Sequence, residues 1–497
     1  MHRDVQIALF GVGLLAAPLF AQDWENVDFV THSTLQAVQP DGRSAYQGGF
    51  PLRVVGIALL NTEDWLDPTP AYTPAYVPYA MGGEAELFVQ ALDRSTLDVL
   101  GVEYYDPDDF GGTAAWMGQN YGNLPFKGDP YFSYTDAEWT AELGRLNWFG
   151  GDSVTDPIRA GDLVEIRARA GLHYEGKLNI NEQHDKDPAK DFEVVRLAAD
   201  IGLPAPALIT LADLKYPDDT DIFDATRATG GERYQTTRVQ LQNVWIDSSH
   251  SQSWLAGDDL WVTDGTRTLR IQLGANPAFD GTAIFEANEP FDVVGVLNQA
   301  ATDGTYSTDG YYLIALKPTD FFSPPPAVVA VDSVKNHGTA GELAIDLPLV
   351  DGVEPRVGGP TQLVVAFDRD VYGSGGPPVD DVAVSSGTVE DVTIAGNVVT
   401  ANLSGVPDAT VLTVAFPGIE SDEGQPCTDT LCIRVLAGDV NGDGEVSIFD
   451  LVTVRDNTGL MATEANCRGD VNGDGGINIF DLVTVRDQTG GTVGSCP

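Results

Sequence analysis

The chain has 497 residues, 43% of them hydrophobic and 20% charged, which is enough for about three or four domains, each with its own core. It carries 27 Lys and Arg against 74 Asp and Glu, a formal net charge of −47. A body this acidic repels phosphate backbones and anionic lipid, so the charge argues against nucleic acid and membrane surfaces as partners and favours cations.

The N-terminal residues have the pattern of an export signal. Met-His-Arg is followed by an apolar stretch over 5–20, and the chain turns polar directly after Ala21. This pattern predicts a signal peptide over 1–21, cleaved after Ala21, with a buried N-terminal helix as the alternative. The apolar run is too short to span a membrane comfortably and no later span follows, so we expect a secreted or cell-surface protein.

Residues 22–215 are expected to form one β domain. A strand-like run covers 52–60, and alternating runs cover 85–91 and 158–168. Residues 106–150, rich in Gly, Asp and aromatic side chains, are predicted to be a long insertion.

Residues 216–323 repeat the same order of strands. Strands are predicted over 237–246, 291–297 and 311–316, and a hairpin over 259–264 and 268–273. This order resembles the oligonucleotide/oligosaccharide-binding (OB) barrels found in tandem in secreted bacterial proteins. The resemblance implies two OB-like barrels that act as binding modules, and an unspecified β-sandwich is the alternative.

Residues 324–437 are predicted to be a Pro-rich linker followed by an immunoglobulin-like β-sandwich. The linker is the Pro-Pro-Pro at 324–326, and short strands follow over 361–367, 389–394, 397–403 and 410–416. The predicted fold is therefore multidomain and mainly β, with a small α-helical module over 438–497.

The four cysteines all lie near the C-terminus, at Cys427, Cys432, Cys467 and Cys496. In an exported protein an even number predicts disulfides, here two. A Cys427–Cys432 bond would close a small loop and a Cys467–Cys496 bond would tie the chain before the last loop to the C-terminus, but sequence does not choose among the three possible pairings. Zinc is disfavoured because the spacings are wrong and no His is near.

The strongest signal is an internal repeat at the C-terminus. The run DVNGDGEVSIFDLVTVRDNTG from 439 returns as DVNGDGGINIFDLVTVRDQTG from 470, with a period of 31 residues and 17 of 21 positions identical. Oxygen-bearing residues recur at positions 1, 3, 5, 7, 9 and 12, the spacing at which a twelve-residue loop surrounds Ca²⁺. The predicted ligands are Asp439, Asn441, Asp443, Glu445 through its carbonyl, Ser447 and Asp450, and then Asp470, Asn472, Asp474, the Gly476 carbonyl, Asn478 and Asp481.

Other loop positions support this interpretation. Gly444 and Gly475 stand at position 6, where the turn excludes a Cβ. Val446 and Ile477 stand at position 8, where we expect the two loops to pair and bury an apolar contact. A helix should follow each loop and end near Gly459 or Gly490.

Position 12 is Asp, whereas the general EF-hand pattern has Glu, and neither loop follows a good entering helix. With the duplication, these features make 438–497 resemble a type I dockerin. The resemblance implies two Ca²⁺ ions and a cohesin-like protein or cell-surface component as partner. It also implies that Ile448, Phe449, Ile479 and Phe480, at positions 10 and 11, touch that partner; internal packing is the alternative. If they are exposed, the repeat allows docking in two orientations.

No catalytic motif was found in the sequence. His173 and His184, near Asp185, Asp187 and Asp191, are better explained as a solvated loop than as a metal or acid/base site. The Tyr and Trp residues over 104–148 are better explained as packing than as a sugar-stacking surface.

These observations favour a secreted calcium-binding protein that docks through its C-terminal module and carries N-terminal binding modules. A polysaccharide is the ligand class considered for those modules. Two alternatives remain: an extracellular polysaccharide-degrading hydrolase of the glycoside hydrolase type, or a nuclease-associated protein, tethered by the same tail; and a structural envelope protein or adhesin. The sequence leans away from an enzyme.

Overall fold

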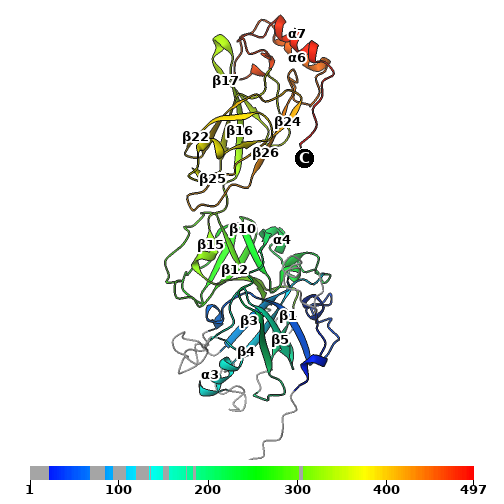
Figure 1. Cartoon of the computed structure of the whole chain (residues 1–497), viewed down its shortest axis with the longest axis vertical. Coiled ribbons are helices and arrows are strands. Elements are labelled where there is room, and N and C mark those ends of the chain that lie inside the picture. The colour runs from blue at the N-terminus through cyan, green and yellow to red at the C-terminus, as the bar shows by residue number, and fades with distance from the viewer. Residues whose placement is uncertain are drawn as a thin grey trace, which may run out of the picture. The chain divides into compact units, whose positions relative to one another are not determined.

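The structure is a computed structural model (Figure 1). It describes residues 22–67, 84–92, 108–118, 134, 136–148, 156–174, 176–182, 186–300 and 306–496, so the predicted signal peptide lies outside the described residues. The chain is mainly β and divides into two compact units, Met1–Phe321 and Phe322–Pro497. In the described ranges no helix is long and apolar enough to cross a membrane.

The first sheet of the first unit has the order β6-β7-β4-β3-β1-β5-β8, with β2 paired to β3. Its strands are β1 (Leu52–Ala58), β2 (Leu66–Asp67), β3 (Glu84–Gln90), β4 (Gly112–Gly118), β5 (Leu163–Ala168), β6 (Gly171–Tyr174), β7 (Lys177–Asn181) and β8 (Phe192–Ala198). The pairs are antiparallel except β4 with β7, which is parallel. The strands β5 and β6 follow each other directly along the chain, and β5 pairs with β1 while β6 pairs with β7. If β5 and β6 are counted as one strand position, the order β1-β3-β4-β7-β6/β5 returns to β1 and nearly closes a ring.

The segment 106–150, predicted as a long insertion, is described only in part, and its described part contributes to the sheet. This segment supplies β4, which lies between β3 and β7, and the helix α3 (Asp136–Arg145), whose Trp139 and Leu143 are buried in the core of this sheet. The strand β4 was missed because nearly all of its residues are buried. A strand covered on both faces shows no alternation of polar and apolar side chains.

The second sheet of this unit has the order β15-β13-β14-β12-β11-β10-β9, with a further pairing of β13 with β10. Its strands are β9 (Ala207–Ile209), β10 (Arg238–Ile246), β11 (Asp259–Thr263), β12 (Thr268–Leu273), β13 (Phe291–Gln299), β14 (Tyr311–Ala315) and β15 (Phe321–Phe322). The further pairing closes a five-stranded ring, β10-β11-β12-β14-β13-β10, in which β12 and β14 are parallel. The five strands predicted over 237–316 are all present, including the hairpin, which turns at Gly265 with φ +87°.

The two sheets share one apolar cluster. Leu60 and Phe88 from the first sheet are buried with Val296 and Ile314 from the second. Residues 22–215 and 216–323, predicted as separate domains, therefore belong to a single compact unit. Short helices border the sheets: α1 (His32–Leu35), α4 (Leu211–Leu214) and α5 (Gly230–Tyr234).

The second unit begins with two antiparallel-dominated sheets around one core. One has the order β17-β16-β19-β23-β22 and the other β18-β26-β24-β21, and a small sheet joins β20 to β25. The strands are β16 (Val328–Asn336), β17 (Glu342–Leu347), β18 (Gly352–Glu354), β19 (Gln362–Phe367), β20 (Tyr372–Gly373), β21 (Ala383–Val384), β22 (Thr388–Ala395), β23 (Val398–Ser404), β24 (Thr410–Ala415), β25 (Ile419–Glu420) and β26 (Thr430–Val435). Leu363, Val399, Leu412 and Val414, all 0% exposed, belong to the core cluster of this β region.

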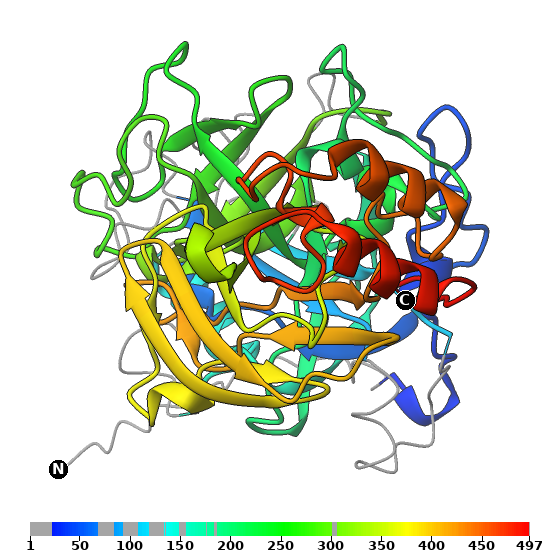
Figure 2. The same ribbon diagram turned by 90° about the horizontal axis from the view of Figure 1, so that it is seen from above.

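Two helices, α6 (Ile448–Asn457) and α7 (Ile479–Gln488), complete this unit and lie next to each other (Figure 2). Their module and the β region share core residues: Ala462 and Cys467 are buried in the β core, and Val353 is buried among the helical residues. The C-terminal module is thus packed onto the β region.

The prediction of two disulfides was wrong, because the structure contains one. The structure joins Cys432 on β26 to Cys496 and leaves Cys427 and Cys467 as buried free thiols. Cys427 stands two residues from Asp429, which bonds the first residue of β16, whereas Cys467 bonds Ala344 on β17, opposite the far end of β16. The two contacted residues of β16, Val328 and Val334, are six positions apart, or roughly 20 Å at about 3.3 Å per residue, which is too far for a bridge.

Candidate metal centre

The first loop is closed by its own position-1 carboxylate. Asp439 Oδ1 accepts hydrogen bonds from the backbone N–H groups of Gly442 (2.7 Å) and Asp443 (3.1 Å), and its Oδ2 accepts from Gly444 (2.7 Å). Gly444 has a φ of +94°, which disfavours any side chain there. The second loop repeats the pattern: Asp470 accepts from the corresponding three N–H groups, and Gly475 has a φ of +100°.

The position-12 carboxylate joins each loop to its helix. Asp450 accepts from the N–H of Ser447 (2.8 Å) and from the N–H of Asn441 (3.0 Å). Ser447 is the N-cap of α6 and accepts from Phe449 N–H, so it forms a capping box with Asp450. Asn478 and Asp481 do the same for α7. The same Asp therefore closes the loop and caps the helix that follows.

The helices end as predicted, but the loops pair differently. Gly459 and Gly490, with φ of +92° and +88°, come directly after the C-cap residues. Val446 and Ile477 are both buried in one apolar cluster, as expected, but their backbones do not hydrogen-bond to each other. Val446 exchanges backbone hydrogen bonds with the residues after α7, and Ile477 exchanges them with the residues after α6. Each loop is thus bonded to the end of the opposite repeat, which makes the two copies depend on each other.

The loops concentrate negative charge in a desolvated place. Asp439, Asp450, Asp470 and Asp481 are all 0% exposed. Burial raises the pKa of Asp439, and the neighbouring charges of Asp450 and Asp443 raise it further. Burial likewise raises the pKa of Asp481, with added repulsion from Asp470 and Asp474. A bound cation would remove this cost, because it stabilises the ionised form.

The donor chemistry of the loops fits a hard cation. Among the described residues, no three His, Cys, Asp or Glu side chains already converge as a metal cluster. The predicted ligand set, however, also contains amide and backbone carbonyl oxygens, the usual companions of carboxylates around Ca²⁺. In each loop the position-5 carboxylate accepts from the position-3 amide, as Asp443 does from Asn441 (2.9 Å). The assignment of the twelve calcium ligands remains a prediction, and the donor oxygens gathered in the two loops are compatible with it.

The four predicted partner-binding residues lie on the surface. Ile448 and Phe449 are 61% and 68% exposed, and Ile479 and Phe480 are 59% and 66% exposed. Each pair opens its helix, one residue after the N-cap. Internal packing therefore does not account for them, and the two copies are exposed almost equally.

One residue that contacts a loop was missed in the sequence analysis. His337, in the turn after β16, bonds Asp470 although the two are 133 residues apart. No sequence pattern links a single His to a loop so distant in the chain.

The histidine and acid cluster considered in the first unit falls only in part within the described residues. His173 lies on β6, while His184 and Asp185 are outside the described residues. A different carboxyl is notable there: Glu182, 2% exposed, accepts from Tyr134 (3.0 Å) and Arg145 (3.1 Å). Burial raises its pKa to about 8, with the charge of Arg145 opposing the shift. These bonds tie α3 to the sheet, and we assign them no activity.

Two calcium-type loops, each followed by one helix, define a paired EF-hand-like module. A family model for the dockerin type I domain matches residues 437–488, which confirms the resemblance drawn from the sequence. Type I dockerin domains typically bind calcium and dock non-covalently to cohesins. No curated protein matches the chain.

Proposed function

We propose that this chain is a secreted calcium-binding protein whose C-terminal module docks it to a cohesin-like or cell-surface partner. The match over 437–488 supports docking as the function of this module, and dockerin proteins are typically extracellular or cell-surface bacterial proteins. The observation that carries the proposal is the almost equal exposure of two Ile-Phe dipeptides, Ile448-Phe449 at the start of α6 and Ile479-Phe480 at the start of α7. We call these dipeptides the Ile-Phe steps. Large apolar side chains at more than half exposure, repeated at equivalent positions, are typical of a protein-binding surface.

The geometry supports docking in either of two orientations. The module is built from two nearly identical loop–helix units, and the pairing of each loop with the end of the other repeat relates the units symmetrically. A partner that recognises one Ile-Phe step therefore meets the same chemistry on the other. Calcium would set the positions of both steps, because the position-12 Asp caps the helix that carries them.

We further propose OB-like barrels for 22–215 and 216–323 and an immunoglobulin-like sandwich for 324–437. Both rings of the first unit support the first proposal, since each has five strand positions in the same order and one parallel pair. In the first ring, α3 lies between β4 and β5 along the chain, which are the third and fourth strand positions in chain order. Two facing sheets around one core support the sandwich. We propose the barrels as ligand-binding modules carried by the docking tail.

Binding of the full chain to a panel of cohesins, with calcium and then with a chelator, tests the docking proposal. We expect saturable binding that chelation abolishes. Phe449→Ala and Phe480→Ala together should remove it. Val350→Ala is the matched control, because Val350 is an exposed apolar residue of the same unit (73% exposed) outside the module. Binding that is unchanged by chelation and by the double substitution would overturn the proposal.

A further inference from the structure

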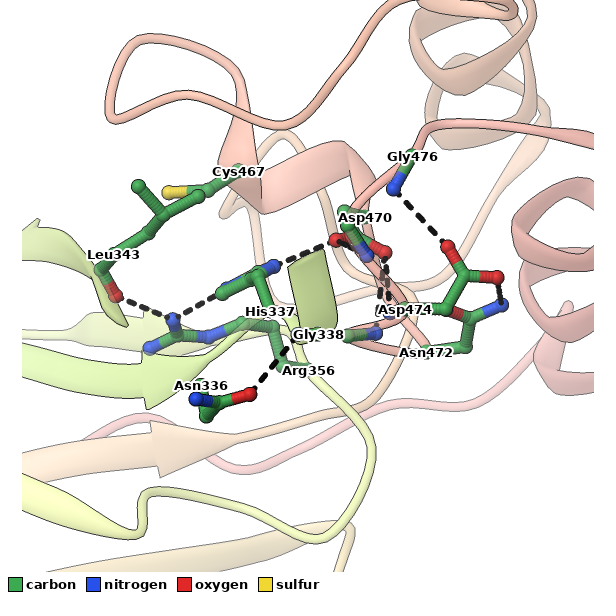
Figure 3. A network of polar contacts seen from close by, with 12 residues as sticks. Asn336, His337, Gly338, Leu343, Arg356, Cys467, Asp470, Asn472, Asp474 and Gly476 are labelled. Carbon is green, nitrogen blue, oxygen red and sulfur yellow. Dashed lines mark hydrogen bonds and ion pairs between the residues drawn. The ribbon is translucent and has the colours of Figure 1, made fainter. Parts of the chain in front are cut away.

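The β region of the second unit reaches into the second calcium loop. His337 Nδ1 lies 2.7 Å from Asp470 Oδ2, and both side chains are 0% exposed (Figure 3). The backbones also meet: Val357 N–H donates to the Val471 carbonyl (2.9 Å). A Cβ on Gly475 would lie 2.6 Å from the His337 carbonyl oxygen. The second loop is thus packed tightly against the turn that follows β16.

The hydrogen on His337 is assigned by its other neighbour. Arg356 Nη1 lies 3.0 Å from His337 Nε2, and a guanidinium can only donate. Nε2 therefore accepts, which leaves Nδ1 to carry the hydrogen and donate it to Asp470. Glu354 holds Arg356 through two bonds of 2.7 and 2.8 Å, so the charge of Arg356 is matched within the β region. The imidazole of His337 is therefore held at Nε2 by Arg356 and donates its Nδ1–H to the second loop.

The first loop has no counterpart to this contact among the described hydrogen bonds. Asp439 accepts from three N–H groups of its own loop, whereas Asp470 accepts from the equivalent three and from His337 as well. Arg434 of β26 does touch the first loop, but it donates to the Gly442 carbonyl and not to a predicted ligand. Loops that are nearly identical in sequence therefore differ in tertiary surroundings.

We propose that His337, held by Arg356, is a positioning residue for Asp470, so that calcium binding in the second loop is coupled to folding of the β region. This inference rests on the calcium-binding function proposed above. A carboxylate already oriented by a fixed donor loses less conformational freedom when it binds an ion, and outer-shell partners of this kind are worth about 10- to 100-fold in metal affinity. Calcium in the second loop would in turn hold β16 and β17 through the same contact.

Calcium titration calorimetry on the full chain tests the affinity half of the inference. Asp443→Ala and Asp474→Ala each remove one exposed position-5 ligand and leave the other loop to be measured. In the Asp443→Ala background, where only the second loop is intact, His337→Gln should weaken calcium binding by about 10-fold or more. In the Asp474→Ala background, where only the first loop is intact, the same substitution should change calcium affinity less than twofold. His337→Asn should restore the second loop, because its amide nitrogen falls near the place of Nδ1.

Hydrogen exchange of peptides covering 328–347 tests the coupling half. With only the second loop intact, calcium should slow exchange there, and His337→Gln should abolish that slowing. Equal loss of affinity in both loops, or no rescue by Asn, would show a general folding defect and overturn the inference. Normal calcium binding with no effect of His337→Gln would overturn the inference alone, whereas no calcium binding in the unsubstituted chain would overturn the proposed function too.

Discussion

The disulfide between Cys432 and Cys496 should decide how firmly the C-terminal segment is held. It closes a segment of 64 residues between β26 and the end of the chain. In the chain-entropy description, closing 64 residues removes about 14 cal/mol/K from the unfolded state, or about 4 kcal/mol at 25 °C. We therefore expect the double substitution of both cysteines by Ser to lower the free energy of unfolding of the second unit by about 4 kcal/mol at saturating calcium.

The chain offers an internal control for this measurement. All eight Trp residues lie in the first unit, so their fluorescence reports on that unit and should not change. Hydrogen exchange in increasing urea, followed in peptides of β26 and α7, reports on the second unit. Reducing the unsubstituted chain should reproduce the loss, and reducing the variant should change nothing. A loss below about 1 kcal/mol would refute the entropic reasoning.

Three further predictions concern separate features of the molecule. Burial raises the pKa of Glu232 to about 7, with a hydrogen bond from Tyr311 and the charge of Arg227 opposing it. The folded state therefore binds this proton more tightly, so Glu232 should lower the stability of the first unit by up to about 3 kcal/mol as pH rises from about 4.5 to 7, in addition to the fall caused by Glu182, whose pKa is raised to about 8. Glu232→Gln should remove its own contribution and make the slope shallower in hydrogen exchange of β13 and β14, and an unchanged slope would contradict the assignment. Gly475→Ala should destabilise the second unit more than Gly444→Ala in urea unfolding. Both force a Cβ at positive φ, costing about 1–2 kcal/mol, but only the first meets a backbone oxygen; the second meets a flexible Arg side chain. For cohesin binding measured by calorimetry, Phe449→Ala or Phe480→Ala alone should cost about twofold, because one of two equal orientations survives, and a large loss from either single change would exclude dual docking.

The dockerin module was predictable because the predicted calcium ligands of each loop lie within twelve consecutive residues. Spacing, the Gly at position 6 and the 31-residue repeat are local properties, and the family match over 437–488 agrees with them. The alternating strands, such as β10 and β12, were predictable for a similar reason, since one buried face leaves a period of two in the sequence. The strands β4 and β7 left no such period because both of their faces are buried.

Other features were decided by the tertiary structure. Sequence left the burial of the Ile-Phe steps open, because their exposure depends on which face of each helix packs inward. The cysteine pairing depends on where along the β region of the second unit each thiol lies. The bond from His337 to Asp470 joins residues 133 apart, and packing of the module on the β region brings them together. A site formed by neighbouring residues can be recognised in the sequence, whereas contacts between residues far apart in the chain form only when the strands have paired and the core has packed.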